Sequence, residues 1–233
     1  ITVNNNVSTK PFSPYDYNEY AATDHGGSVY FDGNGDTIGT YHASNLQLGA
    51  SSAFTLEFWF YANGTSSDYQ SLFSTYSGSS VTDAGQSARL IFNTSNNLFI
   101  LTDGSSNFLQ ITKDVPQNVW NHFCWTRDAS NNHKFYLNGE QIGTSTTSTN
   151  FQTDWWYFAQ RKYNGDQEFT GYISDISLIK GSVTRSSAFT PPTAPLSSSG
   201  TSLHIKGTDA SIIDKSQGAN LKLVGNTTGS TTQ

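Results

Sequence analysis

The sequence predicts an all-β protein, a two-sheet antiparallel sandwich of the jelly-roll type. Short segments alternate apolar with polar residues, turn residues separate them, and no segment repeats apolar residues at helical intervals. Residues 53–62, AFTLEFWFYA, show the alternation clearly. One face of this segment carries Phe54, Leu56, Phe58 and Phe60. The other face carries Thr55, Glu57, Trp59 and Tyr61. Many short strands without helices are typical of sandwiches.

Two long stretches in the middle of the chain predict further strands. Residues 88–112 indicate three strands joined by Asn/Ser and Asp-Gly turns. Residues 119–144 indicate a long strand, a polar turn, a second strand and a hairpin at Asn138–Gly139. These antiparallel pairs account for the centre of the predicted sandwich.

Residues 168–181 predict another long strand, which ends at Gly181. After it, only residues 184–189, which precede a Pro-Pro pair, could form a single helical turn. Alternation in the strands defines an expected core. The residues expected to be buried are Phe54, Leu56, Phe58, Phe60, Trp120, Phe135, Leu137, Trp156, Phe158, Ile176 and Leu178.

Composition excludes several functional classes. Hydrophobic residues make up 35% of the chain and charged residues 13%, with a net charge of −6, so clustered Lys and Arg for nucleic acid or anionic membranes are not expected. No apolar run is long enough to span a bilayer, and no signal peptide is visible. The single cysteine, Cys124, excludes an internal disulfide framework and is expected to be a buried structural thiol.

The C-terminal part of the chain resembles the beginning of a repeat. Residues 190–200 are rich in Pro and Ser and are expected to be a linker. Residues 221–228 can be aligned with residues 1–8 at an offset of 220. We therefore expect residues 197–233 to be a linker and the opening strands of a next repeat, partly completing the first domain. Thr201–Lys206 should add a strand, and the chain from Leu221 should lie against a sheet edge or a neighbouring chain.

Four segments, taken in order, carry a resemblance to a known family. They are GGSVYFDGNGDTI, FTLEFWFYA, WNHFCWTRDASNNHKFYLNGEQIG and FTGYISDISLIKG. Together they resemble the laminin G-like branch of the concanavalin A-like lectin/glucanase superfamily. The following KGSVTRSSAFTPPTAPL looks like the form found in repeated domains of bacteriophage tail and virion fibre proteins. The resemblance implies that residues 1–196 form a laminin G-like jelly roll that binds glycans or proteins outside cells.

Catalysis is not expected, although the same superfamily contains glucanases. The related glucanases place Glu-x-Asp-x-x-Glu on one strand, and this run is absent here. Glu57 stands alone among aromatic residues, while Asp166 and Glu168 lie in a Gly-containing turn. The five histidines show no metal-ligand spacing, and His122 is expected to be a core histidine rather than a base.

A structural calcium ion is the one cofactor that the resemblance suggests; the alternative is none. Asp175 matches the closing-strand Asp of the family, and Asp214 resembles the turn that often supplies other ligands. Each Asp could instead cap a turn by accepting backbone amide hydrogen bonds. Asp32 and Asp36 are expected to be turn residues rather than ligands.

Two adjacent tryptophans point to the candidate binding site. Parity in the strand WWYFA places Trp156 and Phe158 on one face and Trp155 and Tyr157 on the other. The resemblance implies a core residue at the Phe158 position, so Trp156 is expected to pack with it, which leaves Trp155 on the opposite face or at the sheet edge. Trp155 then lies beside a polar loop that supplies Arg161, Tyr163, Asn164 and Asp166. An exposed indole near amide, carboxylate and guanidinium groups suits a sugar ring. Alternatively, Trp155 covers a loop or lies in a contact between chains.

These observations favour a non-enzymatic binding and structural module of a phage tail or virion fibre, located on the virion or outside cells. Its expected partners are a host-surface glycan or receptor and other copies of the repeat, with no membrane insertion and no nucleic acid. Two alternatives stay open. One is a purely structural assembly domain without a ligand, and the other is the carbohydrate-binding module of a secreted glycoside hydrolase.

Overall fold

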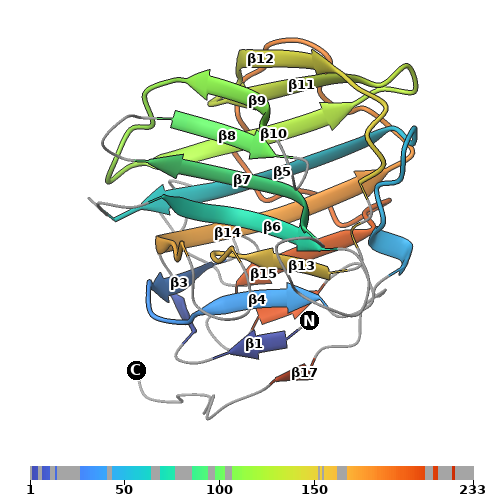
Figure 1. The fold of residues 1–233 in the computed structure, drawn as a ribbon. Helices are drawn as coiled ribbons and strands as arrows, with labels where there is room; N and C mark the ends of the chain where they lie inside the picture. The colour runs from blue at the N-terminus through green and yellow to red at the C-terminus, as the bar shows by residue number, and fades with distance from the viewer. Residues whose placement is uncertain are drawn as a thin grey trace.

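The computed structural model of the chain consists of two stacked β-sheets (Figure 1). The described residues are 2–4, 7–10, 14, 27–40, 44–63, 69–76, 86–93, 98–102, 107–151, 153, 155–161, 167–207, 212–214 and 222–223. Within them, the only helical element is a 3-10 turn, Ser44–Leu46. No helix among these residues is long and apolar enough to cross a membrane. The predicted all-β sandwich is confirmed.

The first sheet has eight strands. Their order is β17 (Lys222–Leu223), β1 (Thr2–Asn4), β4 (Thr37–Thr40), β13 (Trp155–Phe158), β6 (Gln70–Tyr76), β7 (Gln86–Asn93), β8 (Leu98–Thr102) and β9 (Asn107–Thr112). The second sheet has nine strands. The main path is β12 (Glu140–Thr146), β11 (Asn132–Leu137), β10 (Trp120–Arg127), β5 (Phe54–Ala62), β14 (Thr170–Lys180), β15 (Leu203–Gly207) and β16 (Ile212–Asp214). In addition, β3 (Ser28–Asp32) pairs with β14, and β2 (Ser8–Lys10) pairs with β3.

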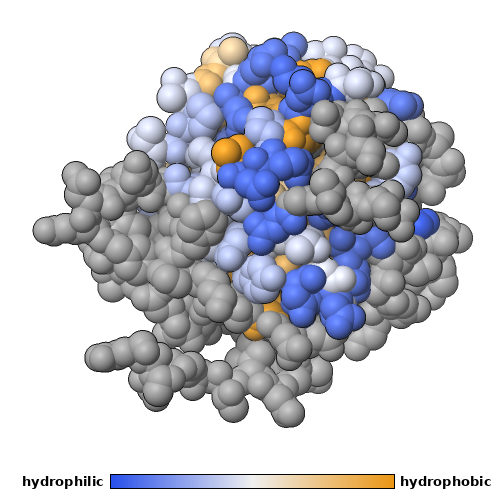
Figure 2. All heavy atoms as spheres, turned by 90° about the vertical axis from the view of Figure 1, so that its left-hand side faces the viewer, coloured by the Kyte–Doolittle hydropathy of each residue, from blue (hydrophilic) through white to orange (hydrophobic). Residues whose placement is uncertain are grey.

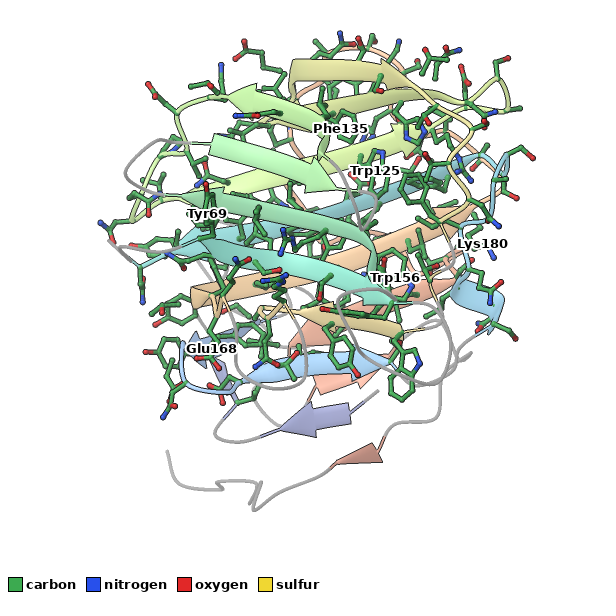
Figure 3. All side chains as sticks on the ribbon, in the orientation of Figure 1. Tyr69, Trp125, Phe135, Trp156, Glu168 and Lys180 are labelled. Carbon is green, nitrogen blue, oxygen red and sulfur yellow. The ribbon has the colours of Figure 1, made fainter. Side chains whose placement is uncertain are left out.

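The core lies between the sheets and follows the alternation in the sequence. Phe54, Leu56, Phe58 and Phe60 are all fully buried. Figure 3 labels three other core residues, Trp125, Phe135 and Trp156, which come from both sheets. Of the expected core residues, all are buried except Trp120.

The prediction for Trp120 was wrong because the inward face of β10 was misassigned. Phe123 and Trp125 pair with Phe58 and Leu56 and face the core. Trp120 instead pairs with Tyr61 on the outer face and is half-buried. Successive residues of a strand point to opposite faces, so one strand cannot bury both sets in one core.

The Asn-Gly hairpin forms as predicted and joins β11 to β12. Asn138 and Gly139 have φ values of 52° and 80°, which fit a tight turn with both central residues left-handed. Next to this turn, β12 approaches β9 of the first sheet. A Cβ on Gly143 would lie 2.8 Å from the Ile111 side chain, so the bare glycine lets the two sheets close together. Lys113 and Glu140 form an ion pair of 2.8 Å at the same place.

Residues 181–202, which we call the strap, connect β14 to β15 over the outer face of the nine-stranded sheet. Backbone hydrogen bonds attach it at Gly181 to Ala53 (2.7 Å), at Phe189 to Gly139 (3.0 Å) and at Ser202 to Leu178 (2.7 Å). The helical turn considered for residues 184–189 does not form. The Pro/Ser stretch expected to be a linker is therefore part of this strap.

Two strands near the C-terminal end, β15 and β17, relate to the predicted sequence repeat. The strand expected over Thr201–Lys206 is β15, which pairs with β14. Further on, β17 pairs with β1 in parallel, with Thr2 opposite Lys222 and Val3 opposite Leu223. Each of these two pairs joins residues 220 positions apart, the offset seen in the sequence. The assignment of residues 197–233 to a following repeat stays a prediction.

Candidate functional site

Strand β13 lies inside the eight-stranded sheet, between β4 and β6, and orients both tryptophans. Trp156 is fully buried, with ring centroids 5.8 Å from Phe73 and 6.1 Å from Phe158. Its predicted packing with Phe158 is confirmed. Trp155 is half-buried on the opposite face, and its ring lies nearly parallel to that of Tyr157 at 6.3 Å.

A layer of aromatic side chains supports Trp155 from within this outer face. Tyr157 is 4% exposed and packs against Tyr76 at 5.8 Å. Its ring lies over Gly39, where a Cβ would be 3.4 Å from the ring carbons, so the glycine gives the ring a flat seat. Trp155 pairs directly with Tyr76 across the strands. The indole is therefore held on a rigid base.

The described ends of the loop after β13, residues 159–161 and residue 167, bond to β6. Ala159 adopts a left-handed φ of 72°, and its amide donates to the Leu72 carbonyl at 3.0 Å. Gln160 and Gln167 attach the two arms of the loop to β6: Ser74 Oγ donates to the Gln160 carbonyl at 2.9 Å, and the Ser71 amide donates to the Gln167 carbonyl at 2.9 Å. The first arm is thus attached near Tyr76, the cross-strand neighbour of Trp155, and the second arm is attached at the other end of β6.

Arg161, a predicted site residue, has its backbone close to the support of Trp155, and its role in a site stays a prediction. It is half-buried, and its carbonyl accepts hydrogen bonds from the hydroxyls of Ser74 and Tyr76. Because Tyr76 is also the cross-strand neighbour of Trp155, Arg161 and Trp155 share one support. The other predicted site residues, Tyr163, Asn164 and Asp166, lie outside the described residues.

A second arginine on this face was not predicted. Arg89 of β7 is half-buried, and its Nη1 donates to Gln167 Oε1 at 3.2 Å. Arg89 is the cross-strand partner of Ser74, so it lies on β7, the next strand after β6, to which the loop ends are bonded. No local pattern in the sequence could show this contact, because it joins residues 78 positions apart.

Glu168 bonds to the turn of residues 32–36, which connects β3 of the nine-stranded sheet to β4 of the eight-stranded sheet. Glu168 Oε1 accepts from the Gly35 amide and, at 3.3 Å, from Gln160 Nε2. Asp36 Oδ2 accepts from the Asp32 amide at 3.1 Å, and Asp32 Oδ1 accepts from the Asn34 amide at 2.8 Å. Asp32 and Asp36 act as turn residues, as the sequence predicted.

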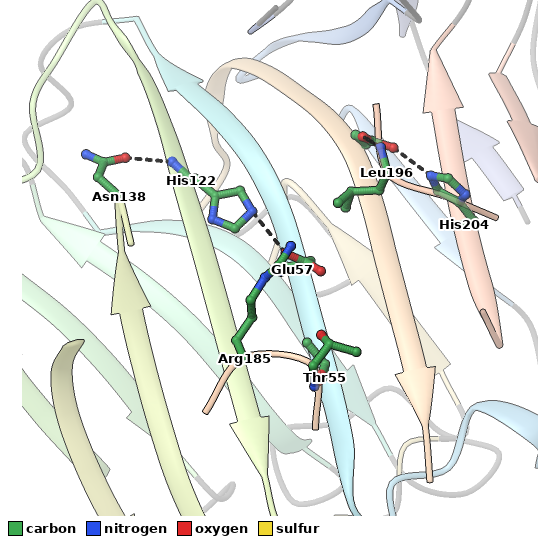
Figure 4. A network of polar contacts seen from close by, with 9 residues as sticks. Thr55, Glu57, His122, Asn138, Arg185, Leu196 and His204 are labelled. Atoms are coloured by element: carbon green, nitrogen blue, oxygen red, sulfur yellow. Dashed lines mark hydrogen bonds and ion pairs between the residues drawn. The ribbon is translucent and has the colours of Figure 1, made fainter. Parts of the chain in front are cut away.

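Asp175, one of the two calcium candidates, has partners for both carboxylate oxygens. It is buried at a bulge in β14 with φ 52°. Oδ1 lies 2.6 Å from His204 Nε2, and Oδ2 accepts from the Leu196 amide at 2.6 Å (Figure 4). This bonding matches the alternative reading, in which the Asp secures nearby backbone. In the part of the chain that the structure describes, no group of three or more His, Cys, Asp or Glu residues is arranged to hold a metal ion.

Asp214, the other calcium candidate, lies at the end of β16 opposite Ile205. The strand β15 thus stands between it and β14, which carries Asp175. Its side chain falls outside the described set, and the calcium ion stays a prediction.

The carboxylate that stood alone in the sequence, Glu57, has partners in the structure. It is 3% exposed, and its Oε2 lies 3.3 Å from His122 Nε2 and 3.3 Å from Arg185 Nη2 of the strap (Figure 4). Cys124 faces Glu57 across the strands, and burial, together with the Glu57 charge, raises the pKa of its thiol well above the ordinary value. The predicted buried thiol is confirmed. This polar cluster lies beneath the strap.

Most of the chain matches a known protein family. Residues 32–187, more than half of the chain, match the family model described as the concanavalin A-like lectin/glucanases superfamily, in its laminin G form. The chain therefore belongs to this superfamily. It matches no curated protein sequence.

Solved structures share this fold at low sequence identity. A proposed carbohydrate-binding protein from Bacteroides ovatus is 15% identical, with a TM-score of 0.62, over 84% of this chain and 57% of its own. Domain 4 of an extracellular GH43 arabinanase from Geobacillus stearothermophilus, solved with arabinotriose, is 14% identical, with a TM-score of 0.53, over 77% and 83%. A heptameric pentraxin from Limulus polyphemus is 14% identical, with a TM-score of 0.52, over 72% and 81%. The chain thus spans little more than half of the Bacteroides protein.

Proposed function

We propose that this chain is a non-enzymatic carbohydrate-binding module whose glycan contact is centred on Trp155. The observation that carries the proposal is a half-buried indole supported by Tyr157 and Tyr76 beside an anchored polar loop. Arg161 belongs to that loop, and Tyr163, Asn164 and Asp166 follow in the sequence. The indole contacts the C–H face of a sugar, and the loop supplies donors and acceptors for its hydroxyls.

The absence of catalysis is part of the proposal. General acid–base chemistry needs a carboxylate or histidine that can reach a substrate. Glu57 and His122, the ionisable pair in the middle of the nine-stranded sheet, are 3% and 0% exposed. The strap covers them, because Arg185 bonds to Glu57 and the Phe189 ring lies 5.6 Å from His122. This arrangement supports a structural role for both residues.

We further propose that the module belongs to a phage tail or virion fibre and recognises glycans on the host surface. Two features support this setting. The strap sequence resembles that of repeated fibre domains, and β17 pairs with β1 at the offset of the sequence repeat. A purely structural assembly domain is the alternative favoured by the second feature alone. A binding module of a secreted hydrolase is the alternative to which the arabinanase domain points, through its fold.

The experiment that tests the proposal is a glycan array with the wild-type chain, Trp155→Ala and Trp155→Phe. Binding signals should be lost in Trp155→Ala and partly kept in Trp155→Phe, because a phenyl ring still offers a stacking face. The melting temperature should change little in both variants, since Trp155 lies on the outer face rather than in the core. A wild-type chain without any signal, or a large loss of stability in Trp155→Ala with binding kept, would contradict the proposed site.

A further inference from the structure

A row of four aromatic side chains crosses the outer face of the nine-stranded sheet. Tyr30 of β3 is opposite Tyr172 of β14, Tyr172 is opposite Tyr61 of β5, and Tyr61 is opposite Trp120 of β10. The ring centroids of these neighbours are 5.0, 5.9 and 5.7 Å apart. We call these four residues the aromatic row. Sequence alternation alone did not reveal it, because the row depends on the register of four strands.

The part of the outer face that the strap covers lies next to the aromatic row. Tyr136 is fully buried, with its ring 5.4 Å from Phe189, and Trp59 is 8% exposed beside His122. All four residues of the aromatic row are instead partly exposed, although Tyr61 and Trp120 lie only two residues from Trp59 and His122 on the same strands. The outer face is thus divided into a covered part and a row of rings that reaches solvent.

The chemistry of the aromatic row suits a sugar chain. Neighbouring strands lie about 4.8 Å apart, but the rings converge, because Trp120 and Tyr172, two strands apart, have ring centroids only 6.4 Å apart. The rings of Tyr61, Tyr172 and Trp120 thus form a compact group, with Tyr30 beside Tyr172. The rings of these pairs are inclined to each other by 48°, 86° and 67°, so they do not form one flat stack. Faces contact sugar C–H groups, and the three tyrosine hydroxyls can donate to and accept from sugar hydroxyls.

The surroundings favour a glycan over a protein partner. None of the four side chains is charged, and the only exposed large hydrophobic residue in the described part of the chain is Val119. On the end of the molecule that Figure 2 shows, the coloured surface is mostly hydrophilic, with small separate hydrophobic spots. Protein interfaces usually have a wider apolar centre.

We propose that the aromatic row is a second carbohydrate-binding surface, whose compact group of rings takes one or two sugar residues of an uncharged polysaccharide. It shares the ligand class of the proposed function but none of its residues, because Trp155 belongs to the other sheet. Cross-strand aromatic pairs also stabilise a sheet without any ligand. The test must therefore separate binding from stability.

Affinity electrophoresis of the full chain, in gels that contain dextran, xylan, arabinan or galactomannan, with an alginate gel as the anionic comparison, provides this separation. The main variant is the triple change Tyr30→Phe, Tyr61→Phe and Tyr172→Phe, which removes three hydroxyls and keeps the rings packed. The matched control is Tyr136→Phe, which removes a hydroxyl from the same face under the strap. Trp120→Ala then tests a ring, with its fold checked by a cooperative melting transition.

The wild-type chain should be retarded by at least one of the four polysaccharides. The triple variant and Trp120→Ala should lose affinity at least tenfold, Tyr136→Phe should bind like the wild type, and Trp155→Ala should keep measurable retardation. A triple variant that binds like the wild type overturns the proposal, as does a wild-type chain that no gel retards or that is retarded only by the anionic polysaccharide alginate. If Trp155→Ala alone abolishes all binding, the proposed function stands and the aromatic row has no share in it.

Discussion

At the scale of single residues, Arg127 shows how this fold buries a charge. Its guanidinium donates to the carbonyls of Leu48 (2.5 Å), Gly49 (2.9 Å) and Ser52 (2.7 Å) and lies 5.0 Å from the centre of the Phe54 ring. Burial lowers its pKa to about 10, which still leaves it charged at neutral pH. Arg127 thus fixes the segment before β5 by donating to backbone carbonyls there, one of which, that of Gly49, also accepts from the Phe151 amide.

Replacing Arg127 with Met should destabilise the protein by about 3 kcal/mol, because the buried carbonyls of Leu48 and Ser52 lose their Arg127 donor and that of Gly49 keeps only the Phe151 amide. Chemical denaturation measures this loss. Lys113→Met is the matched control, since Lys113 has only a partly exposed ion pair with Glu140, and it should cost less than about 1 kcal/mol. Equal effects of the two changes would show that the carbonyl contacts contribute little.

His133 should make stability depend on pH. It is fully buried, and its Nδ1 accepts a hydrogen bond from Trp125 Nε1 at 3.0 Å, so it must be neutral. Burial first, and then the charge of Arg127, lowers its pKa to about 4. The unfolded chain, with a histidine pKa of about 6.5, binds the proton more readily. The resulting stabilisation is complete above pH 6.5 and is lost as the pH falls toward 4, by at most about 3 kcal/mol.

Urea denaturation between pH 4 and pH 7 tests this dependence. In His133→Gln, which keeps an acceptor for the Trp125 indole, the fall in stability over this range should be smaller by most of that amount. The difference between the wild type and the variant isolates His133 from the other titrating groups. Parallel curves for the two proteins would mean that His133 does not carry the pH dependence.

At the scale of elements, the strap is held by the β11–β12 hairpin. A Cβ on Gly139 would lie 1.8 Å from the Phe189 carbonyl oxygen, and φ at Gly139 is 80°. Gly139→Ala should therefore combine backbone strain with displacement of the strap and cost about 3 kcal/mol or more. Gly181→Ala is a close control, because φ there is 87° but no atom lies within 4 Å of a Cβ. It should cost only the backbone strain of about 1–2 kcal/mol.

Limited proteolysis gives a second measurement of the same change. Cleavage within residues 181–202 should become faster in Gly139→Ala and stay near the wild-type rate in Gly181→Ala. Equal cleavage and equal stability in the two variants would contradict the role of Gly139 as the seat of the strap.

The long strands and their faces could be predicted from the sequence, because burial on one side imposes a period of two on β5 and β13. The same rule failed at Trp120, since β10 carries aromatic residues on both faces. Parity also placed Trp155 and Tyr157 correctly. The support beneath them could not be foreseen, because Tyr76 and Gly39 come from strands far away in the sequence. The strap was missed because Pro and Ser are as common in linkers as in extended segments that bond to a surface.

At the scale of the whole molecule, β15 joins the C-terminal part of the chain to the sandwich. Deleting residues 197–233 removes β15 and leaves buried Asp175 without its partner His204. This truncation should unfold the protein or cost at least about 3 kcal/mol. Deleting only residues 221–233 removes β17 and should cost less than about 1 kcal/mol, since β15 and its contacts remain. Thermal unfolding and mass in solution measure both, and a stable, monomeric product of the longer deletion would contradict this reading.

The contact between Gly139 and Phe189 also constrains how this chain can vary. The two residues are 50 positions apart in the sequence, yet the carbonyl of one occupies the space that a side chain of the other would need. A larger residue in the hairpin is therefore compatible only with a strap that takes another path. In exchanges of segments between relatives, hairpin and strap should be inherited together, and chimaeras that mix them should fold poorly even when each half comes from a stable parent.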